Sequence, residues 1–252
     1  MSLKNLVRAR LPYKITRRLA RWHYYGRLVG SFLKKTDKCC PCCGYVGHFA
    51  LFGIPPRLDA LCPKCDSLER HRLLVLADRE LALFEGSKSL LHFAPERVVA
   101  QLLRARMTTY VTADLCAQDD LCAQDVDAQE NIEDMSFEDE CFDIVLCIHV
   151  LEHVDDGLAL AEIHRILRPG GRLIAMVPIV EGWEETYEKA DIASPEMRQL
   201  HFGQRDHVRR YGADFRERLR KAGFQLNEFT APAEDVIKYS LHRGEKVFVC
   251  YK

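Results

Sequence analysis

Short, almost unbroken apolar runs alternate with longer amphipathic stretches from about residue 69 to the end of the chain. Such runs are typical of strands buried on both faces, and they occur at 89–93, 109–113, 141–150 and 172–178. Apolar residues have helical spacing at 69–84, 96–106, 157–168 and 213–224. This order predicts βαβ units in an α/β domain with a mostly parallel sheet. Two last strands, near 224–229 and 246–251, are separated by a loop and can pair antiparallel.

Three segments interrupt this alternation. The sequence PGG at 169–171 predicts a turn into the strand that follows it. A long polar insertion occupies 181–212, and the hexapeptide DLCAQD occurs twice in tandem, at 114–119 and 120–125. Two copies are too few to bury a core between them, so the duplication predicts an extended surface loop without chemistry of its own.

The first 36 residues differ from the rest of the chain in charge. They contain ten Lys or Arg and no Asp or Glu, whereas residues 37–252 carry 26 basic and 37 acidic groups. Leu6, Leu19 and Trp22 lie among the cations, which predicts one or two basic amphipathic helices. Such a segment can bind an anionic membrane surface or nucleic-acid phosphates, or it can pack on the acidic body with its cations solvated.

The composition is that of an ordinary globular protein, since 48% of the 252 residues are apolar and 29% are charged. No run of eighteen apolar residues is present, which argues against a transmembrane helix. The N-terminus shows no apolar core of a secretory signal, and eleven cysteines are too few for a disulfide scaffold of this length. We therefore expect a cytoplasmic protein, with peripheral contact at the inner membrane face as one option for residues 1–36.

Four cysteines have the spacing of a zinc site, in two CxxC pairs separated by eighteen residues: Cys40, Cys43, Cys62 and Cys65. Two such turns direct four thiolates at one tetrahedral ion, and a site of four thiolates is structural rather than catalytic. Cys39 and Cys42 offer a shifted register, but the sequences CPCCG and CPKC place proline between the preferred ligands. Residues 37–68 are thus predicted to form a zinc module between the basic segment and a domain at 69–252.

Polar residues that follow the predicted strands indicate a nucleoside cofactor at the carboxyl edge of the sheet. The turn HFAPE at 92–96 follows the first strand of the domain. Asp114 ends the next strand, where a carboxylate can accept hydrogen bonds from ribose hydroxyls. Asn131 and Ile132 precede the strand at 141–150, where the amide can bond an adenine amine and the isoleucine can pack on the ring.

The run from Asp114 to 178, with NIEDMSFEDECFDIVLCIHVLEHVDD and EIHRILRPGGRLIAMVP, resembles a class I S-adenosylmethionine-dependent methyltransferase of the type-11-like group. The cysteine module and SLERHR at 67–72 resemble the subset of these enzymes with a zinc-binding N-terminal extension. The resemblance implies a Rossmann-like seven-stranded sheet with helices on both faces. It also implies S-adenosylmethionine as the cofactor and a structural Zn²⁺ in the N-terminal module.

The first loop of the family reads acidic–x–Gly–x–Gly, and here the same positions read HFAPE. Each Cβ occupies space that a glycine leaves open. Pro95 has no N–H and Glu96 adds negative charge at a helix start, which disfavours a pyrophosphate and suits the cationic S-adenosylmethionine. The cofactor contacts that the resemblance implies are His92, Ala94, Glu96, Asp114, Asn131, Ile132 and His149.

Two histidines are the predicted catalytic residues. His149 ends the strand at 141–150, at the edge where open α/β sheets bind ligands, and its imidazole can take a proton from a hydroxyl or amine. The alternative is a histidine that only forms hydrogen bonds beneath the cofactor. His207 lies in HFGQRDHVRRYG, a polar stretch predicted to be a substrate lid or a pocket for an acidic group, although its neighbour Asp206 need not face the same way. His153, in LEHV, is interpreted as structural.

The motif SLERHR is not explained by helix capping, because Arg70 stands where a capping box from Ser67 needs an acid. It is predicted to link the zinc module to the domain or to touch substrate.

The sequence as a whole predicts an S-adenosylmethionine-dependent methyltransferase that acts on an O or N atom of a small molecule or a membrane-associated glycan intermediate. One alternative is an RNA methyltransferase that holds phosphates with the zinc module and the basic segment. The non-catalytic alternative is a zinc-stabilised binding protein whose altered first loop no longer holds the cofactor.

Overall fold

The computed structural model describes residue 36 and residues 38–53, 56–115 and 126–252. Almost all of the predicted basic segment and most of the DLCAQD repeat lie outside the described residues. No helix within these ranges is long and apolar enough to cross a membrane.

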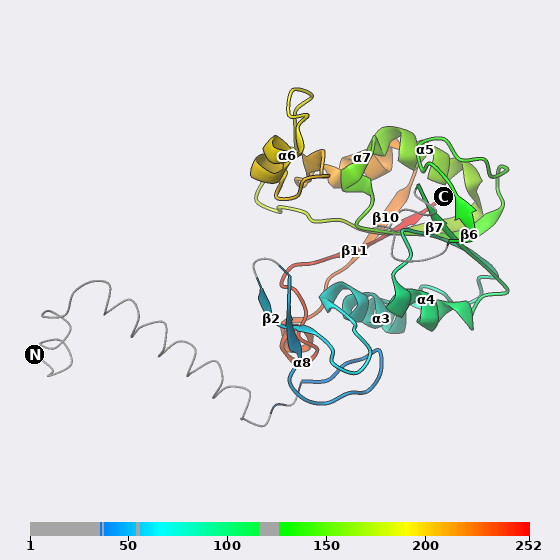
Figure 1. Ribbon diagram of the computed structural model, residues 1–252. Helices are drawn as coiled ribbons and strands as arrows, with labels where there is room; N and C mark the ends of the chain where they lie inside the picture. Colours follow the sequence, from blue (N-terminus) through cyan, green and yellow to red (C-terminus); the bar gives the residue numbers. More distant parts are fainter. Residues whose placement is uncertain (1–35, 37, 54–55, 116–125) are drawn as a thin grey trace, which may run out of the picture.

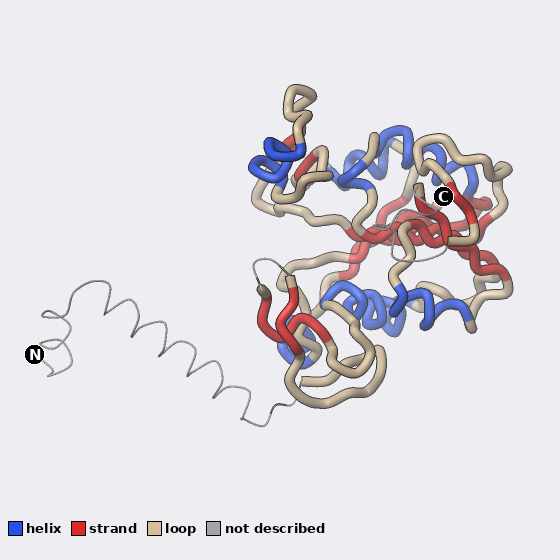
Figure 2. The backbone as a smooth tube through the Cα atoms, in the orientation of Figure 1, coloured by secondary structure: helices blue, strands red, loops and turns tan. Residues whose placement is uncertain are grey.

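A seven-stranded sheet forms the centre of the fold, with the strand order β10–β11–β7–β6–β3–β4–β5 (Figures 1 and 2). The strands are β3 Ser89–Phe93, β4 Thr109–Asp114, β5 Ala128–Gln129, β6 Phe142–Ile148, β7 Leu167–Met176, β10 Gln225–Phe229 and β11 Val247–Tyr251. The five strands from β7 to β5 are parallel, whereas β11 is antiparallel to both β7 and β10. The predicted Rossmann-like sheet of seven strands, with an antiparallel pair at the end of the chain, is confirmed.

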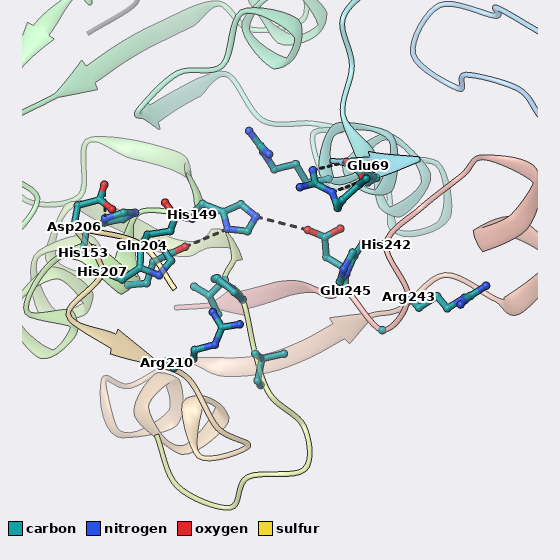
Figure 3. Close-up of a pocket in the computed structure, with 17 residues that line it drawn as sticks. Glu69, His149, His153, Gln204, Asp206, His207, Arg210, His242, Arg243 and Glu245 are labelled. Atoms are coloured by element: carbon teal, nitrogen blue, oxygen red, sulfur yellow. Dashed lines mark hydrogen bonds and ion pairs between the residues drawn. The ribbon is translucent and has the colours of Figure 1, made fainter. Parts of the chain in front are cut away.

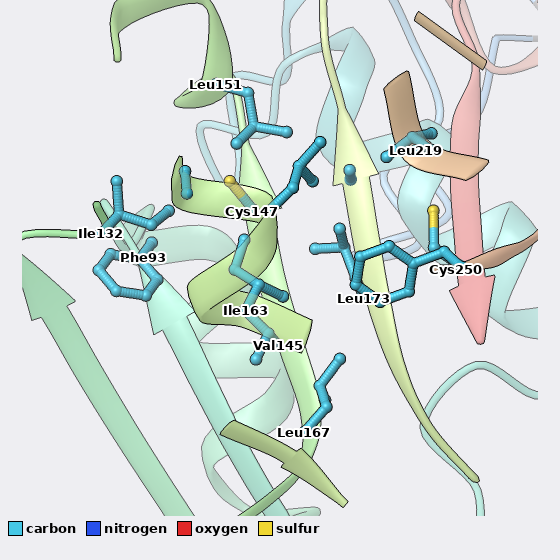
Figure 4. Packing of buried hydrophobic residues seen from close by; sticks show 14 of the residues in the cluster. Phe93, Ile132, Val145, Cys147, Leu151, Ile163, Leu167, Leu173, Leu219 and Cys250 are labelled. Carbon is cyan, nitrogen blue, oxygen red and sulfur yellow. The ribbon is translucent and has the colours of Figure 1, made fainter. Parts of the chain in front are cut away.

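Helices cover both faces of the sheet (Figure 1). They are α3 Glu69–Leu81 and α4 Arg97–Arg104 on one face, and α5 Asp156–Ile166 and α7 Phe215–Lys221 on the other. Successive side chains of a strand point to opposite faces, so the apolar run of β6 supplies both cores. Val145 and Cys147 belong to the cluster that includes Ile163 of α5 (Figure 4), whereas Ile144 and Leu146 belong to the α3 and α4 side.

Three parts of the architecture differ from the expectation. The strand β5 was not predicted, because two residues carry no periodicity. The PGG sequence does not separate two elements; it lies inside β7, where the pairing register with β6 shifts and Gly170 has φ 76°. A Cβ on Gly171 would lie 2.8 Å from the Arg168 carbonyl oxygen, so only glycine fits this bulge. No helix or strand was predicted within the insertion, which contains α6 Pro195–Phe202 between two short paired strands.

The zinc module is a small hairpin that packs on the domain through α3. Its strands are β1 Ala50–Phe52 and β2 Arg57–Leu61, which pair antiparallel. Arg72 of α3 is fully buried, and its guanidinium donates to backbone carbonyls of Ala60 in the module and of Tyr239 after α8 Ala233–Lys238. A buried guanidinium requires such acceptors, so Arg72 joins the two parts.

Candidate functional site

A pocket of about 550 Å³ opens at the carboxyl ends of β6 and β7 (Figure 3). Its walls come from η1 Leu151–His153, the segment 204–210, the loop 242–245 before β11, and the start of α3. Four histidines line it: His149, His153, His207 and His242. Four carboxylates line it as well: Glu69, Glu152, Asp206 and Glu245. A pocket of this size with converging polar groups suits a polar small molecule.

His149 lies between two carboxylates in the centre of the pocket (Figure 3). Its Nδ1 donates to Glu152 Oε1 over 3.1 Å, and its Nε2 lies 3.6 Å from Glu245 Oε1. Burial disfavours the charged form, but the two carboxylates outweigh burial and raise the pKa of His149 to about 9. At neutral pH this imidazole is therefore protonated and donates hydrogen bonds, which is not the form that a general base needs.

His207 has the opposite electrostatic surroundings. It is 2% exposed, and burial lowers its pKa, so the imidazole is neutral near pH 7. Its ring is nearly perpendicular to that of His153, with centroids 4.6 Å apart. The carboxylate of Asp206 lies 3.3 Å from Nδ1 of His153 instead. Asp206 therefore pairs with His153 and not with its sequence neighbour, and His153, which the sequence indicated as structural, lies in the pocket wall.

The first loop has the backbone conformation of a glycine-containing turn without a glycine. Ala94 has φ 47°, a left-handed conformation that is uncommon for residues with a Cβ. Its N–H donates to the Ala113 carbonyl over 2.9 Å, which fixes the turn against β4. Pro95 and Glu96 then lead into α4, for which Glu96 is the N-cap residue. The loop therefore keeps its path close to the edge of the sheet.

The carboxylate of Glu96 is bound within the protein by the SLERHR motif. Arg70 donates to Oε1 from both Nε and Nη2, and Nε2 of His71 lies 2.8 Å from Oε2. Burial raises its pKa, but the contacts with His71 and Arg70 prevail and lower it to about 2. The expectation that this charge faces a cationic cofactor needs correction, because Arg70 already compensates it. The capping reading needs correction too, because His71 Nδ1 accepts the Leu68 N–H at the start of α3.

His92 lies in the core beneath the loop. Its side chain is fully buried, and its Nδ1 lies 2.7 Å from the Tyr110 hydroxyl. Burial lowers the pKa of His92 to about 4, so the imidazole is neutral. The buried position of His92 does not fit the predicted contact with the cofactor. Side chains alternate between the two faces of β3, and this alternation directs the imidazole into the core.

The other predicted cofactor residues meet at the carboxyl ends of β3, β4 and β5. Parallel pairing places Phe93 beside Ala113 and Asp114 beside Gln129, so Asp114 at the end of β4 lies at the same edge as Ala94, which follows β3. Asn131 is exposed just after β5. Ile132 is 4% exposed and packs in the core near Phe93 (Figure 4). The structure therefore brings a main-chain turn, a carboxylate and an amide to one edge.

The four predicted zinc ligands lie together. The Sγ atoms of Cys40, Cys43, Cys62 and Cys65 are all within 4.8 Å of one another. The Cys40–Cys65 and Cys43–Cys62 distances are each 3.7 Å. A tetrahedral ion with Zn–S bonds of about 2.3 Å requires about 3.8 Å between its sulfur atoms, so the four thiolates fit Zn²⁺. Cys39 and Cys42, the shifted register, are not part of this group.

Comparison with known proteins agrees with this geometry. A family described as a methyltransferase domain matches residues 87–175. The chain carries a class I S-adenosylmethionine-dependent methyltransferase domain. An S-adenosylmethionine-dependent methyltransferase from Mesorhizobium loti has the same fold, with a TM-score of 0.50 at 13% identity over 71% of this chain and 98% of that one.

Two curated relatives match the methyltransferase domain. The uncharacterised protein YafE of Escherichia coli is 37% identical over 98 residues, which cover 36% of this chain and 41% of YafE. The ubiquinone/menaquinone biosynthesis C-methyltransferase UbiE of Vibrio campbellii is 27% identical over 132 residues, covering 47% of this chain and 50% of UbiE. The chain spans half or less of the length of these relatives.

Several residues that line the pocket were not predicted from the sequence. Glu152 was overlooked inside LEHV, although a carboxylate one turn beyond a strand end is a usable signal. Glu245 belongs to a loop 96 positions beyond His149, so no local pattern connects the two. Arg57 pairs with Glu69 over 2.8 Å and brings the zinc module to the pocket wall.

Proposed function

We propose that the chain transfers a methyl group from S-adenosylmethionine to an oxygen or nitrogen atom of a small polar molecule that binds in the pocket beside His149. The observation that carries this proposal is the position of the pocket. It lies at the carboxyl end of β6, next to the strand edge that holds Ala94 and Asp114. Open α/β sheets bind ligands at this edge, where the chain order reverses between β3 and β6.

S-adenosylmethionine supplies the electrophilic methyl group when it is bound. We assign its binding to the main chain at Ala94, the carboxylate of Asp114 and the amide of Asn131, with Ile132 supporting the edge from below. These groups fit the cofactor because no phosphate has to be held: Pro95 has no N–H, and the N–H of Ala94 already donates to the Ala113 carbonyl. Glu96 stabilises the loop through its ion pair with Arg70.

The two predicted catalytic histidines take different parts in this proposal. His207 is neutral and accepts a proton from the acceptor, while protonated His149 donates a hydrogen bond that orients it. The mixed charges of the pocket support an acceptor with both donors and acceptors of hydrogen bonds. A pocket of about 550 Å³ is of the size that encloses small molecules, which favours them over an RNA chain. A membrane-associated glycan intermediate is supported as the acceptor only by the basic charge of residues 1–36.

Calorimetric titration with S-adenosylmethionine and with S-adenosylhomocysteine tests the cofactor part. Asp114→Asn is expected to lower affinity at least tenfold, because hydrogen bonds to a charged group contribute about 1.5–3 kcal/mol. Asp235→Asn, on the far-lying α8, is the matched control and should bind as the wild type does. Absence of binding by the wild type at millimolar ligand would overturn the proposed function and favour the non-catalytic alternative.

A further inference from the structure

The acceptor pocket contains a second group of metal-ligating side chains, separate from the four cysteines. Glu152, His153 and His207 each offer a ligand atom, and these atoms lie within 4.8 Å of one another. All three residues line the pocket, and two of them are almost fully buried, Glu152 at 1% and His207 at 2% exposure. Figure 3 shows His153 and His207 converging on one side of the pocket.

Glu152 supplies an independent observation that points to a ligand at this position. Its Oε1 accepts the hydrogen bond from His149, but its Oε2 is buried without a hydrogen-bond partner among the described residues. A buried carboxylate oxygen left unsatisfied costs about 1–3 kcal/mol, and native proteins rarely leave one without a partner such as water or an ion. A cation next to Oε2 would remove this cost.

A carboxylate contacts one ring nitrogen of His153, as is common for metal-bound histidines. Asp206 places a carboxylate oxygen 3.3 Å from Nδ1, which leaves Nε2 as the ring nitrogen for an ion. Such a carboxylate fixes the tautomer and the orientation of the ring, and it raises the basicity of the ligating nitrogen. The perpendicular stacking of His153 and His207, at 4.6 Å between centroids, brings both rings to the same point of the wall.

We propose that Glu152, His153 and His207 bind one divalent first-row transition-metal ion in the acceptor pocket. Two imidazoles and one carboxylate suit ions such as Zn²⁺, Mn²⁺, Fe²⁺ or Co²⁺ better than Mg²⁺ or Ca²⁺, which prefer oxygen ligands. Three protein ligands leave coordination positions open to the pocket, as in catalytic rather than structural sites. The acceptor would fill these positions through an oxygen or nitrogen atom, so the site deepens the proposed function. With the ion bound, His207 would be a ligand, and the ion would take over its part by lowering the pKa of the bound acceptor.

Manganese is the probe that separates this site from the four cysteines, because Mn²⁺ prefers oxygen and nitrogen to thiolate ligands. The purified full chain, carrying its Zn²⁺, is titrated with MnCl₂ near neutral pH, and the ion is followed by electron paramagnetic resonance and calorimetry. We expect one Mn²⁺ per chain. His153→Gln and Glu152→Gln should each weaken Mn²⁺ binding at least tenfold, while His242→Gln, which removes a histidine from the same pocket, should change it less than twofold.

A wild-type protein that binds no Mn²⁺ at millimolar concentration would overturn the inference, and so would Mn²⁺ binding that His153→Gln and Glu152→Gln leave intact. Circular dichroism of each variant shows whether it is folded, and His153→Gln is the safer of the two because its side chain is 27% exposed. The proposed function fails separately: it fails if S-adenosylmethionine does not bind, whatever the result with Mn²⁺.

Discussion

The ion pair beneath the first loop gives a quantitative prediction for Glu96→Gln. The pKa of Glu96 falls from its ordinary value of 4.5 to about 2 in the folded protein, in spite of burial, because of His71 and Arg70. A difference of this size corresponds to about 3 kcal/mol of folding free energy at pH 7, since each pKa unit is worth about 1.4 kcal/mol. Glutamine keeps the shape of the side chain and removes the charge, so the variant should lose about that amount.

The dependence on pH follows from the direction of the shift. A carboxyl group whose folded pKa lies below its unfolded pKa stabilises the protein fully above about pH 5, and the contribution disappears as the pH falls toward 2. At pH 3 the contribution is roughly half of its value at pH 7. The penalty of Glu96→Gln relative to the wild type should therefore shrink in acid.

Urea denaturation followed by circular dichroism at pH 7 and pH 3 measures this penalty, with the wild type and the variant compared at each pH. Glu85→Gln serves as the matched control, because Glu85 is exposed after α3, and it should change stability by less than about 0.5 kcal/mol. The reasoning is refuted if Glu96→Gln costs less than about 1 kcal/mol at pH 7, or if its cost is the same at both pH values.

Three further predictions address other parts of the structure. Elemental analysis should find one Zn²⁺ per chain in the wild type; Cys62→Ser should abolish it and lower the melting temperature, whereas Cys39→Ser should leave both unchanged. Equal losses in the two variants would contradict the assigned register. Tyr211→Phe should lower the free energy of unfolding in urea by about 1 kcal/mol, because the buried hydroxyl donates to Asp156 over 2.9 Å. An unchanged free energy of unfolding would show that this hydrogen bond does not hold the insertion to the domain. Arg57→Gln should raise the KM for the acceptor several-fold while the melting temperature stays nearly constant, because the Arg57 side chain is 42% exposed in its ion pair with Glu69. A large fall in melting temperature with an unchanged KM would show that Arg57 stabilises the fold and does not contact the acceptor.

The sheet could be predicted from sequence because its strands carry their own signal. The run at 89–93 is apolar except for Ser89 and His92 and is buried at every position, so the pattern alone indicates a buried strand here. The clustering of the four cysteines was likewise predictable, because CxxC spacing brings two thiols together within one turn.

The acceptor pocket could not be predicted in the same way, because its contacts join distant parts of the chain. Asp206 pairs with His153 and not with its neighbour His207, since the segment before β9 Arg209–Arg210 turns between the two residues. Glu96 looked available to a ligand because nothing near it in sequence indicated that Arg70 would reach it from α3. Only the packing of α3 against the first loop reveals that pair.

The helix α3 lies outside the family match but belongs to the folded unit of this protein. The family match begins at residue 87, but the groups that brace the first loop lie on α3, five and six residues beyond Cys65. A truncated chain that starts at 87 would leave the Glu96 carboxylate buried without Arg70, and it would expose the apolar face that α3 covers. We therefore expect the cooperative folding unit to include at least α3, so that it starts before the first residue of the family match.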